Sequence, residues 1–185
     1  MNYLPPCLPR IEVQCVGAVF ELERPMIAAT PRTCPTNLAS LANLLARDLP
    51  SYTNRVIQRR RKLSDKLYSS ILAVGKPDLT PIAIVSREYP PQFPQSAPSQ
   101  VFISSLERQY TGIRATDLQE FHWLFLAKTS LGWRLVNIYT RTSTGTGTRN
   151  RDSPITPPIE SSKSSIAEAV RLWLNDCYFG KIADG

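Results

Sequence analysis

The sequence has few of the residues on which metal and nucleophilic chemistry depend. His122 is the only histidine among 185 residues. The four cysteines are Cys7, Cys15, Cys34 and Cys177, and no two of them stand at the spacing of a zinc-ligand pair. We therefore predict no metal site and no catalytic residue.

Phosphate-binding loops and long apolar runs are also missing. The segment "STGTGT" is the nearest match to a phosphate loop, but no lysine follows it and no helix begins directly after it. We therefore expect no nucleotide and no cofactor. No uninterrupted run of about 18 apolar residues occurs, so we predict no membrane-spanning helix.

Positive charge is present in excess and is concentrated in one segment. The formal net charge is +7. Between Arg47 and Lys66 the chain has seven basic and two acidic residues, a net of +5. Such a field attracts acidic protein faces, anionic lipids and nucleic acids. We predict a contact surface formed by Arg55, Arg59, Arg60, Arg61 and Lys62.

Two helical patterns follow one another from Cys34 onward. The segment "CPTNLASLANLLARDLP" (34–50) places Leu38, Leu41 and Leu45 on one face and ends at a proline, which normally stops a helix. The segment "SYTNRVIQRRRK" (51–62) continues at helical spacing but is much more polar. We expect two helices separated at Pro50.

The middle of the chain changes to a strand pattern. The segments 66–74 and 80–88 are rich in branched and aromatic residues and flank the turn signal "GKPD", which predicts a hairpin. A third strand is expected over 100–111. The stretch 89–99 is rich in proline and is predicted to be a loop.

The segment 118–142 predicts a hairpin around "TSLG". Opposing Lys128 to Trp133 sets the remaining pairs by counting: Phe125 with Val136, Trp123 with Ile138, Phe121 with Thr140, and Glu120 with Arg141. The first three pairs then form one apolar face. The opposite face is expected to carry His122, paired with Tyr139 beside Leu124 and Asn137.

The last part of the chain predicts a polar loop over 143–160 and a final helix. Ser165 and Glu168 stand at capping-box spacing, and Gly180 marks the end. The apolar face of this helix consists of Ile166, Val170, Trp173 and Cys177. We expect an α+β fold: an antiparallel meander of about five strands, with two N-terminal helices and one C-terminal helix packed on one face.

Cys34 precedes the first helix, and Cys177 lies on the buried face of the last. The two thiols can form a disulfide if these helices pack side by side. The alternative is a pair of inert core thiols in a reducing cytosol. A disulfide requires an oxidising compartment, so this pair bears on where the protein is located.

The carboxylates nearest the aromatic hairpin are Glu107, Asp117 and Glu120. We interpret them as charged residues near strand ends, and His122 as a half-buried structural histidine. An enzyme with a pocket beside His122, Tyr139 and Glu120 remains an alternative, because an acid and a base on one pocket wall could act together.

The segments "TCPTNLASLANLLARDLPSYTNRVIQRRRK", "SSLERQY", "LQEFHWLFLAKTSLGWRLVNIYT" and "AVRLWLNDC" resemble a family of small, uncharacterised cyanobacterial proteins that are predicted to be exported. The resemblance covers about residues 33–180, without the loops at 90–99 and 143–160. It implies a leader before the "CP" motif and a second cysteine in the last helix, positions held here by Cys34 and Cys177. It implies no activity.

We therefore expect a single domain over 34–182 after a poorly ordered extension, 1–33. The extension contains no signal peptide as written, but "MIAATPRTCP" resembles the tail of a cleaved leader. The leading hypothesis is a non-enzymatic protein exported to the periplasm or thylakoid lumen. Its basic segment, 55–62, would bind an acidic protein face or an anionic membrane surface. A cytosolic nucleic-acid-binding protein that uses the same arginines is the alternative.

Overall fold

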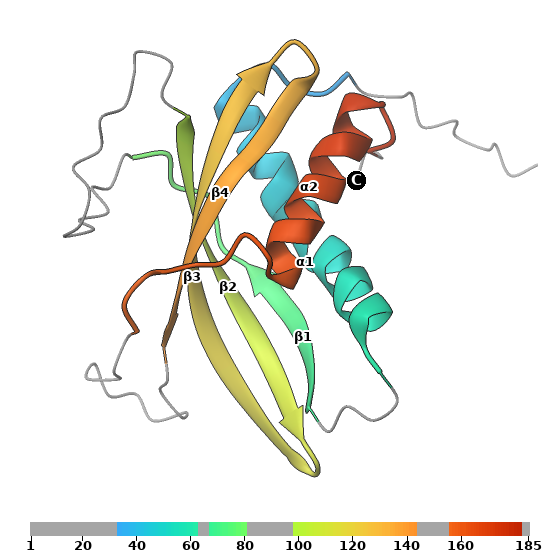
Figure 1. Cartoon of the computed structure of the whole chain (residues 1–185), viewed down its shortest axis with the longest axis vertical. Coiled ribbons are helices and arrows are strands. Elements are labelled where there is room, and N and C mark those ends of the chain that lie inside the picture. Colours follow the sequence, from blue (N-terminus) through green and yellow to red (C-terminus); the bar gives the residue numbers. More distant parts are fainter. Residues whose placement is uncertain (1–32, 63–66, 81–97, 144–155, 183–185) are drawn as a thin grey trace, which may run out of the picture.

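The computed structural model describes residues 33–62, 67–80, 98–143 and 156–182. These residues form α1 (Leu38–Arg60), β1 (Leu67–Val74), β2 (Ser99–Thr111), β3 (Arg114–Thr129), β4 (Gly132–Ser143), β5 (Ile159–Glu160) and α2 (Ser165–Tyr178). The strands form one sheet in the order β1-β2-β3-β4-β5, and all neighbours are antiparallel. Both helices lie on the same side of it (Figure 1). The predicted α+β meander is confirmed.

The two predicted N-terminal helices are one helix. α1 continues through Pro50, so the expected break is wrong. An interior proline costs about 3 kcal/mol, but the buried face continues on both sides of it, through Leu45, Leu49 and Val56. Burial of each of these large side chains contributes about 1.5–3 kcal/mol, which outweighs the proline. The helix begins at the N-cap Asn37, whose side chain accepts from two backbone N–H groups.

The predicted strands agree with the structure at β1, β2, β3 and β4. The strand expected over 80–88 lies outside the described residues except for Thr80, and the described partner of β1 is β2. The short strand β5 lies within the segment predicted as a loop, 143–160. The predicted extension, 1–33, also lies outside the described residues except for Thr33. In the described part of the chain, neither helix is long and apolar enough to cross a membrane.

The predicted β3–β4 register is correct at the turn and shifts by one residue beyond it. Lys128 pairs with Trp133, but an extra residue in β4 then interrupts the ladder, so that Phe125 pairs with Asn137. The predicted pairing of His122 with Tyr139 is therefore wrong, because His122 pairs with Thr140. Val136, the unpaired residue of this bulge, is 53% exposed.

The core lies between the helices and one face of the sheet. The sheet contributes Val101, Ile103, Leu124, Leu126 and Ile138, and the helices contribute leucines of α1 and the predicted apolar face of α2. Trp173 is fully buried, and its indole N–H donates to Asp48 of α1 (2.8 Å). The N-cap of α2 is Ser164 rather than Ser165, since the Ser164 side chain accepts from the backbone N–H of Ala167. The Glu168 side chain pairs with Arg60.

Cys34 and Cys177 are joined by a disulfide, with a Cα–Cα distance of 5.0 Å. The bond connects the residues before α1 to the last turn of α2. Next to it, the indole of Trp133 donates to the backbone oxygen of Pro35 (3.1 Å). The disulfide closes a loop with a sequence separation of 143, so in the chain-entropy model it restricts a large part of the unfolded chain.

We predict that replacing Cys34 and Cys177 together by alanine lowers the free energy of unfolding by about 5 kcal/mol, the loop-closure value for this separation. Denaturant unfolding of the oxidised protein and the double variant measures the difference. A non-reducing peptide map should contain the peptides of Cys34 and Cys177 as one linked species. A reductant should destabilise the natural chain and leave the double variant unchanged; equal sensitivity of both would contradict the assignment.

Candidate functional site

The sheet face under the helices changes from apolar to polar along the strands. Close to the disulfide end the strands present core leucines and isoleucines, and further along they present hydroxyl, carboxyl and imidazole groups. From the apolar end to the polar end, the side chains on this face are Ile103, Ser105 and Glu107 on β2; Leu124, His122 and Glu120 on β3; and Ile138, Thr140 and Thr142 on β4. A polar layer therefore lies between the second half of α1, the start of α2 and the sheet.

A pocket of about 300 Å³ occupies this polar layer. Its walls come from α1, from the start of α2 and from all five strands. The polar groups include Thr53, Glu107, Glu120 and His122, together with hydroxyls of β1, β4 and the α2 cap; four isoleucines complete the lining. A pocket of this volume is at the lower end of the range of small-molecule sites.

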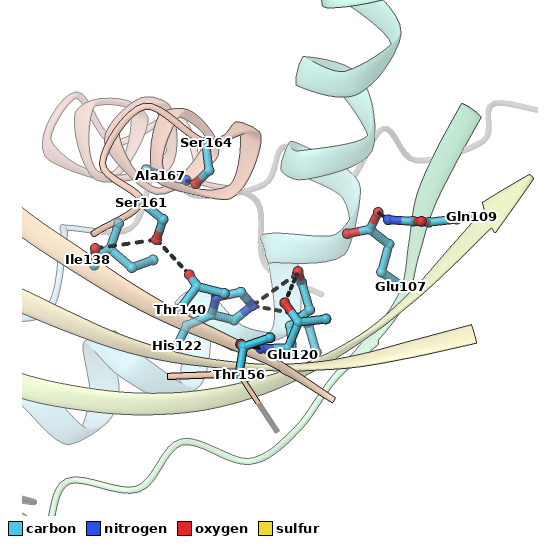
Figure 2. Close-up of polar contacts among 12 residues, drawn as sticks. Glu107, Gln109, Glu120, His122, Ile138, Thr140, Thr156, Ser161, Ser164 and Ala167 are labelled. Atoms are coloured by element: carbon cyan, nitrogen blue, oxygen red, sulfur yellow. Dashed lines mark hydrogen bonds and ion pairs between the residues drawn. The ribbon is translucent and has the colours of Figure 1, made fainter. Parts of the chain in front are cut away.

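His122 is completely buried at the inner wall of the pocket, not half-buried as expected. Its Nδ1 lies 3.0 Å from the Thr140 hydroxyl, and its Nε2 lies 2.9 Å from the Ser105 hydroxyl. Thr140 in turn contacts the Ser161 hydroxyl at 2.6 Å, and Ser161 donates to the backbone oxygen of Ile138. Figure 2 shows His122 beside Thr140, and the contacts from Thr140 through Ser161 to Ile138.

One order of donors is consistent with all of these hydroxyl contacts and assigns a tautomer to His122. The single Ser161 proton goes to the Ile138 carbonyl, so Ser161 accepts from Thr140. Thr140 has then used its own proton and must accept from the imidazole. In this order His122 carries its proton on Nδ1, and its Nε2 accepts from Ser105.

Ser105 and His122 have the contact of a nucleophile and its base, but the arrangement does not supply an accessible nucleophile. Burial lowers the pKa of His122 to about 4, which makes its imidazole a weak base. Ser105 is itself 2% exposed and does not line the pocket. The network instead holds three strands together, in agreement with the interpretation of His122 as a structural histidine.

Glu120 is the strongly perturbed acid of the pocket. Burial, followed by the charge of Glu107, raises its pKa to about 7, and the hydrogen bond from Thr142 (3.3 Å) only partly offsets this. Its other oxygen lies 3.7 Å from His122 Nε2. Because the imidazole of His122 is neutral at the pH where Glu120 ionises, the contact between them is not an ion pair. Glu120 therefore changes between its neutral and charged forms near neutrality.

α1 covers the open edge of the described sheet and so forms one wall of the pocket. Asn54 donates to the backbone oxygen of Ile71 (2.9 Å) and accepts from the N–H of Ile71 (2.7 Å). These two bonds pair the backbone groups of this residue on the edge strand β1. The neighbouring Thr53 lines the pocket. Its hydroxyl is buried and has no hydrogen-bond partner in the part of the chain that the structure describes.

The basic segment, residues 55–62, lies at the end of α1, and all five of its predicted contact residues are exposed. Arg55 is held 4.1 Å above the ring of Tyr52, and Arg61 is held 4.9 Å above the ring of Tyr68. Arg60 donates to the backbone oxygen of Lys163 (3.2 Å) and pairs with Glu168. The predicted residues are therefore close together, and three of them have fixed positions.

A notch of about 160 Å³ adjoins the pocket beside this segment. It is lined by Arg60, Arg61 and Tyr68, among others, and shares Ile57, Ser69 and Ser165 with the pocket. Cations therefore border a cavity whose interior carries carboxyl groups. The sequence contains no signal for either cavity, because the cavity walls come from segments that are distant in the chain.

The remaining sequence-predicted residues lie away from the pocket. Asp117 forms a two-point pair with Arg108 at 2.7 and 2.8 Å on the exposed part of β2 and β3. Tyr139 pairs with Trp123 on the face opposite the helices and makes a ring contact with Phe125. Of the group proposed for an enzyme, the structure brings together His122 and Glu120 but not Tyr139.

Comparison with known proteins gives no match: no family model, no curated protein and no solved structure corresponds to the chain. The resemblance to a family of exported cyanobacterial proteins therefore stays a prediction. Among the described residues, no group of three or more histidine, cysteine, aspartate or glutamate side chains is arranged to hold a metal ion.

We predict that Glu120→Gln stabilises the protein at high pH. Because the folded-state pKa of Glu120, about 7, lies above its ordinary value of 4.5, ionisation destabilises the fold as pH rises between these values. The variant should be more stable than the natural chain by about 3 kcal/mol at alkaline pH, and equally stable below about pH 4.5.

Denaturant unfolding at a series of pH values measures this difference. Because the folded-state pKa of His122 is lowered from 6.5 to about 4, both proteins lose folding free energy as the pH falls below 6.5. This loss is common to the natural chain and the variant, so it cancels in the difference between them. Asp117→Asn, at an exposed carboxylate of the same strand, serves as the control and should give no stabilisation at alkaline pH. A pH-independent difference for Glu120→Gln would contradict the assignment.

Proposed function

We propose that the protein is an exported, non-enzymatic binding domain that contacts an acidic face of another protein through its basic segment, residues 55–62. One observation carries the proposal: five exposed cations lie together at the end of α1, and the guanidinium groups of Arg55 and Arg61 rest on tyrosine rings. Anionic membrane surfaces and nucleic acids are the alternative partners.

Stacking on tyrosine prepares these arginines for binding. A guanidinium group that contacts a ring through its flat face keeps its N–H donors in the plane, where they can meet a carboxylate. Because the side chain is already positioned, less conformational entropy is lost when a partner binds. Arg60, held by Lys163 and Glu168, adds a third fixed cation.

The notch beside Arg60 and Arg61 provides an anchor point for a partner carboxylate. The first turn of α2 borders this notch through Ser165, and the amino end of a helix favours a negative charge. An acidic side chain that enters the notch would meet the guanidinium group of Arg61, that of Arg60, which also pairs with Glu168, and this helix end. This geometry supports a discrete acidic contact over a uniformly charged surface.

The disulfide between Cys34 and Cys177 supports the exported location. Such bonds persist in oxidising compartments and are rare in the cytosol of most organisms. The resemblance stated above points to the periplasm or the thylakoid lumen. Export and acidic-partner binding are separate parts of the proposal, and each can fail without the other.

We predict that Arg55→Glu/Arg59→Glu weakens binding to a poly-glutamate peptide by roughly tenfold, or about 1.4 kcal/mol. The double variant reverses two exposed charges one helical turn apart. Arg114→Glu/Arg134→Glu, which makes the same change in net charge at exposed sites on the sheet, should keep most of the affinity. Fluorescence anisotropy of a labelled peptide, measured at low salt and repeated at high salt, gives both affinities.

The same pair of variants separates the alternative partners. Vesicles containing phosphatidylglycerol and a single-stranded oligonucleotide are tested under identical salt conditions. Stronger binding to the oligonucleotide with a steep salt dependence would favour the nucleic-acid alternative, and stronger binding to vesicles would favour the membrane. An equal loss in both double variants would mean that only overall charge matters, and would overturn the assignment to residues 55–62.

A further inference from the structure

We propose that the pocket between α1, α2 and the sheet binds a small organic cation, a primary alkylammonium group held by the carboxyl groups of Glu107 and Glu120 with Thr53 on the facing wall. This site is independent of the basic segment and of the acidic partner proposed for it. It would make the protein a receptor for an amine-bearing small molecule.

The first observation is the unpartnered hydroxyl of Thr53. Thr53 is 1% exposed, lines the pocket and has no hydrogen-bond partner among the described residues. Buried polar groups in native proteins nearly always have a partner, so an unpaired one in a cavity wall points to a group that enters the cavity. The Thr53 oxygen can accept a hydrogen bond from an ammonium N–H group.

The second observation is the charge of the lining. Two carboxyl groups, Glu107 and Glu120, face the pocket, and among the described residues no lysine or arginine lines it. The neighbouring imidazole of His122 is neutral, and its Nε2 lies 2.9 Å from the Ser105 hydroxyl. The carboxyl groups therefore have no cationic partner within the pocket. A bound cation would relieve the repulsion that Glu107 exerts on the ionised form of Glu120.

The shape of the lining indicates what the cation is attached to. Ile57, Ile71, Ile159 and Ile166 form the apolar part of the wall, which suits a short alkyl chain. A primary ammonium group has three N–H donors, and carboxyl and hydroxyl oxygens provide the acceptors. Among organic cations, a primary alkylamine therefore fits both parts of the lining.

Binding of the cation should be linked to a proton. Glu120 interacts with Glu107 of β2, with His122 of its own strand and with Thr142 of β4, while α1 and α2 contribute Thr53, Ile57 and Ser165 to the lining of the pocket. Arg60 and Arg61 lie in the adjoining notch. Below neutrality Glu120 holds a proton, which an incoming ammonium group must displace. The affinity should therefore rise roughly tenfold per pH unit up to about pH 7 and then level off.

The test uses the full chain without a histidine tag, because His122 is then the only source of an imidazole NMR signal and reports from the pocket wall. The protein is titrated with n-butylamine and, separately, with 1-butanol, which has the same shape but no charge. We expect a saturable shift of the imidazole signal with the amine and none with the alcohol. Equal responses to both, or no saturable response to the amine, would overturn the proposal.

Three variants complete the experiment. Glu120→Gln should weaken amine binding at least tenfold and abolish its pH dependence, and it should fold, because it removes a buried charge. Thr53→Val should weaken binding and keep the pH dependence. Asp117→Asn, at an exposed carboxylate on the same strand, should bind as the natural chain does. Unchanged binding in Glu120→Gln, or binding that does not vary with pH in the natural chain, would refute the site.

Discussion

A single extra residue in β4 decides which side chains face the helices. Without the bulge at Val136, strict alternation from Trp133 would turn Asn137 and Tyr139 toward the helices and Ile138 and Thr140 away from them. With the bulge, Ile138 enters the core and Thr140 meets His122. The hydrogen-bonded network, the lining of the pocket and the environment of Glu120 all follow from this shift.

The helix-facing side of the sheet is packed at one end and encloses a cavity at the other. Around Leu124 and Leu126 it is closed by the helices and by the disulfide, so burial there stabilises the fold. Around Glu120 the same helices leave a cavity, and burial raises the pKa of a carboxyl group instead. A site of this kind costs stability in proportion to the charge it desolvates. The well-packed end with the disulfide offsets this cost.

Much of the fold could be predicted because its signals are local. The buried face of α2 and the strands on both sides of "TSLG" depend on periodicities within one segment. The pairing of Cys34 with Cys177 also requires that the two helices pack side by side. The break predicted at Pro50 is wrong because burial of Leu49 and Val56 in the core, which no local pattern contains, outweighs the proline. The bulge at Val136 has no sequence signal of its own. The pocket draws on seven elements, so only the assembled fold could place Thr53 opposite Glu120.

Two regions of opposite charge adjoin each other in this molecule, and salt should affect them differently. The arginines of the basic segment are exposed, so dissolved ions screen them strongly; the carboxyl group of Glu120 is mostly buried and is screened much less. Arg60 and Arg61 at the notch repel a cation that approaches the pocket, and this repulsion weakens as the ionic strength rises. Added salt should therefore weaken binding of an acidic partner at residues 55–62, while the affinity of the pocket for an alkylamine is kept or increased. Parallel titrations of poly-glutamate and n-butylamine across ionic strength distinguish two separate sites from one diffuse charged surface, for which both affinities would fall together.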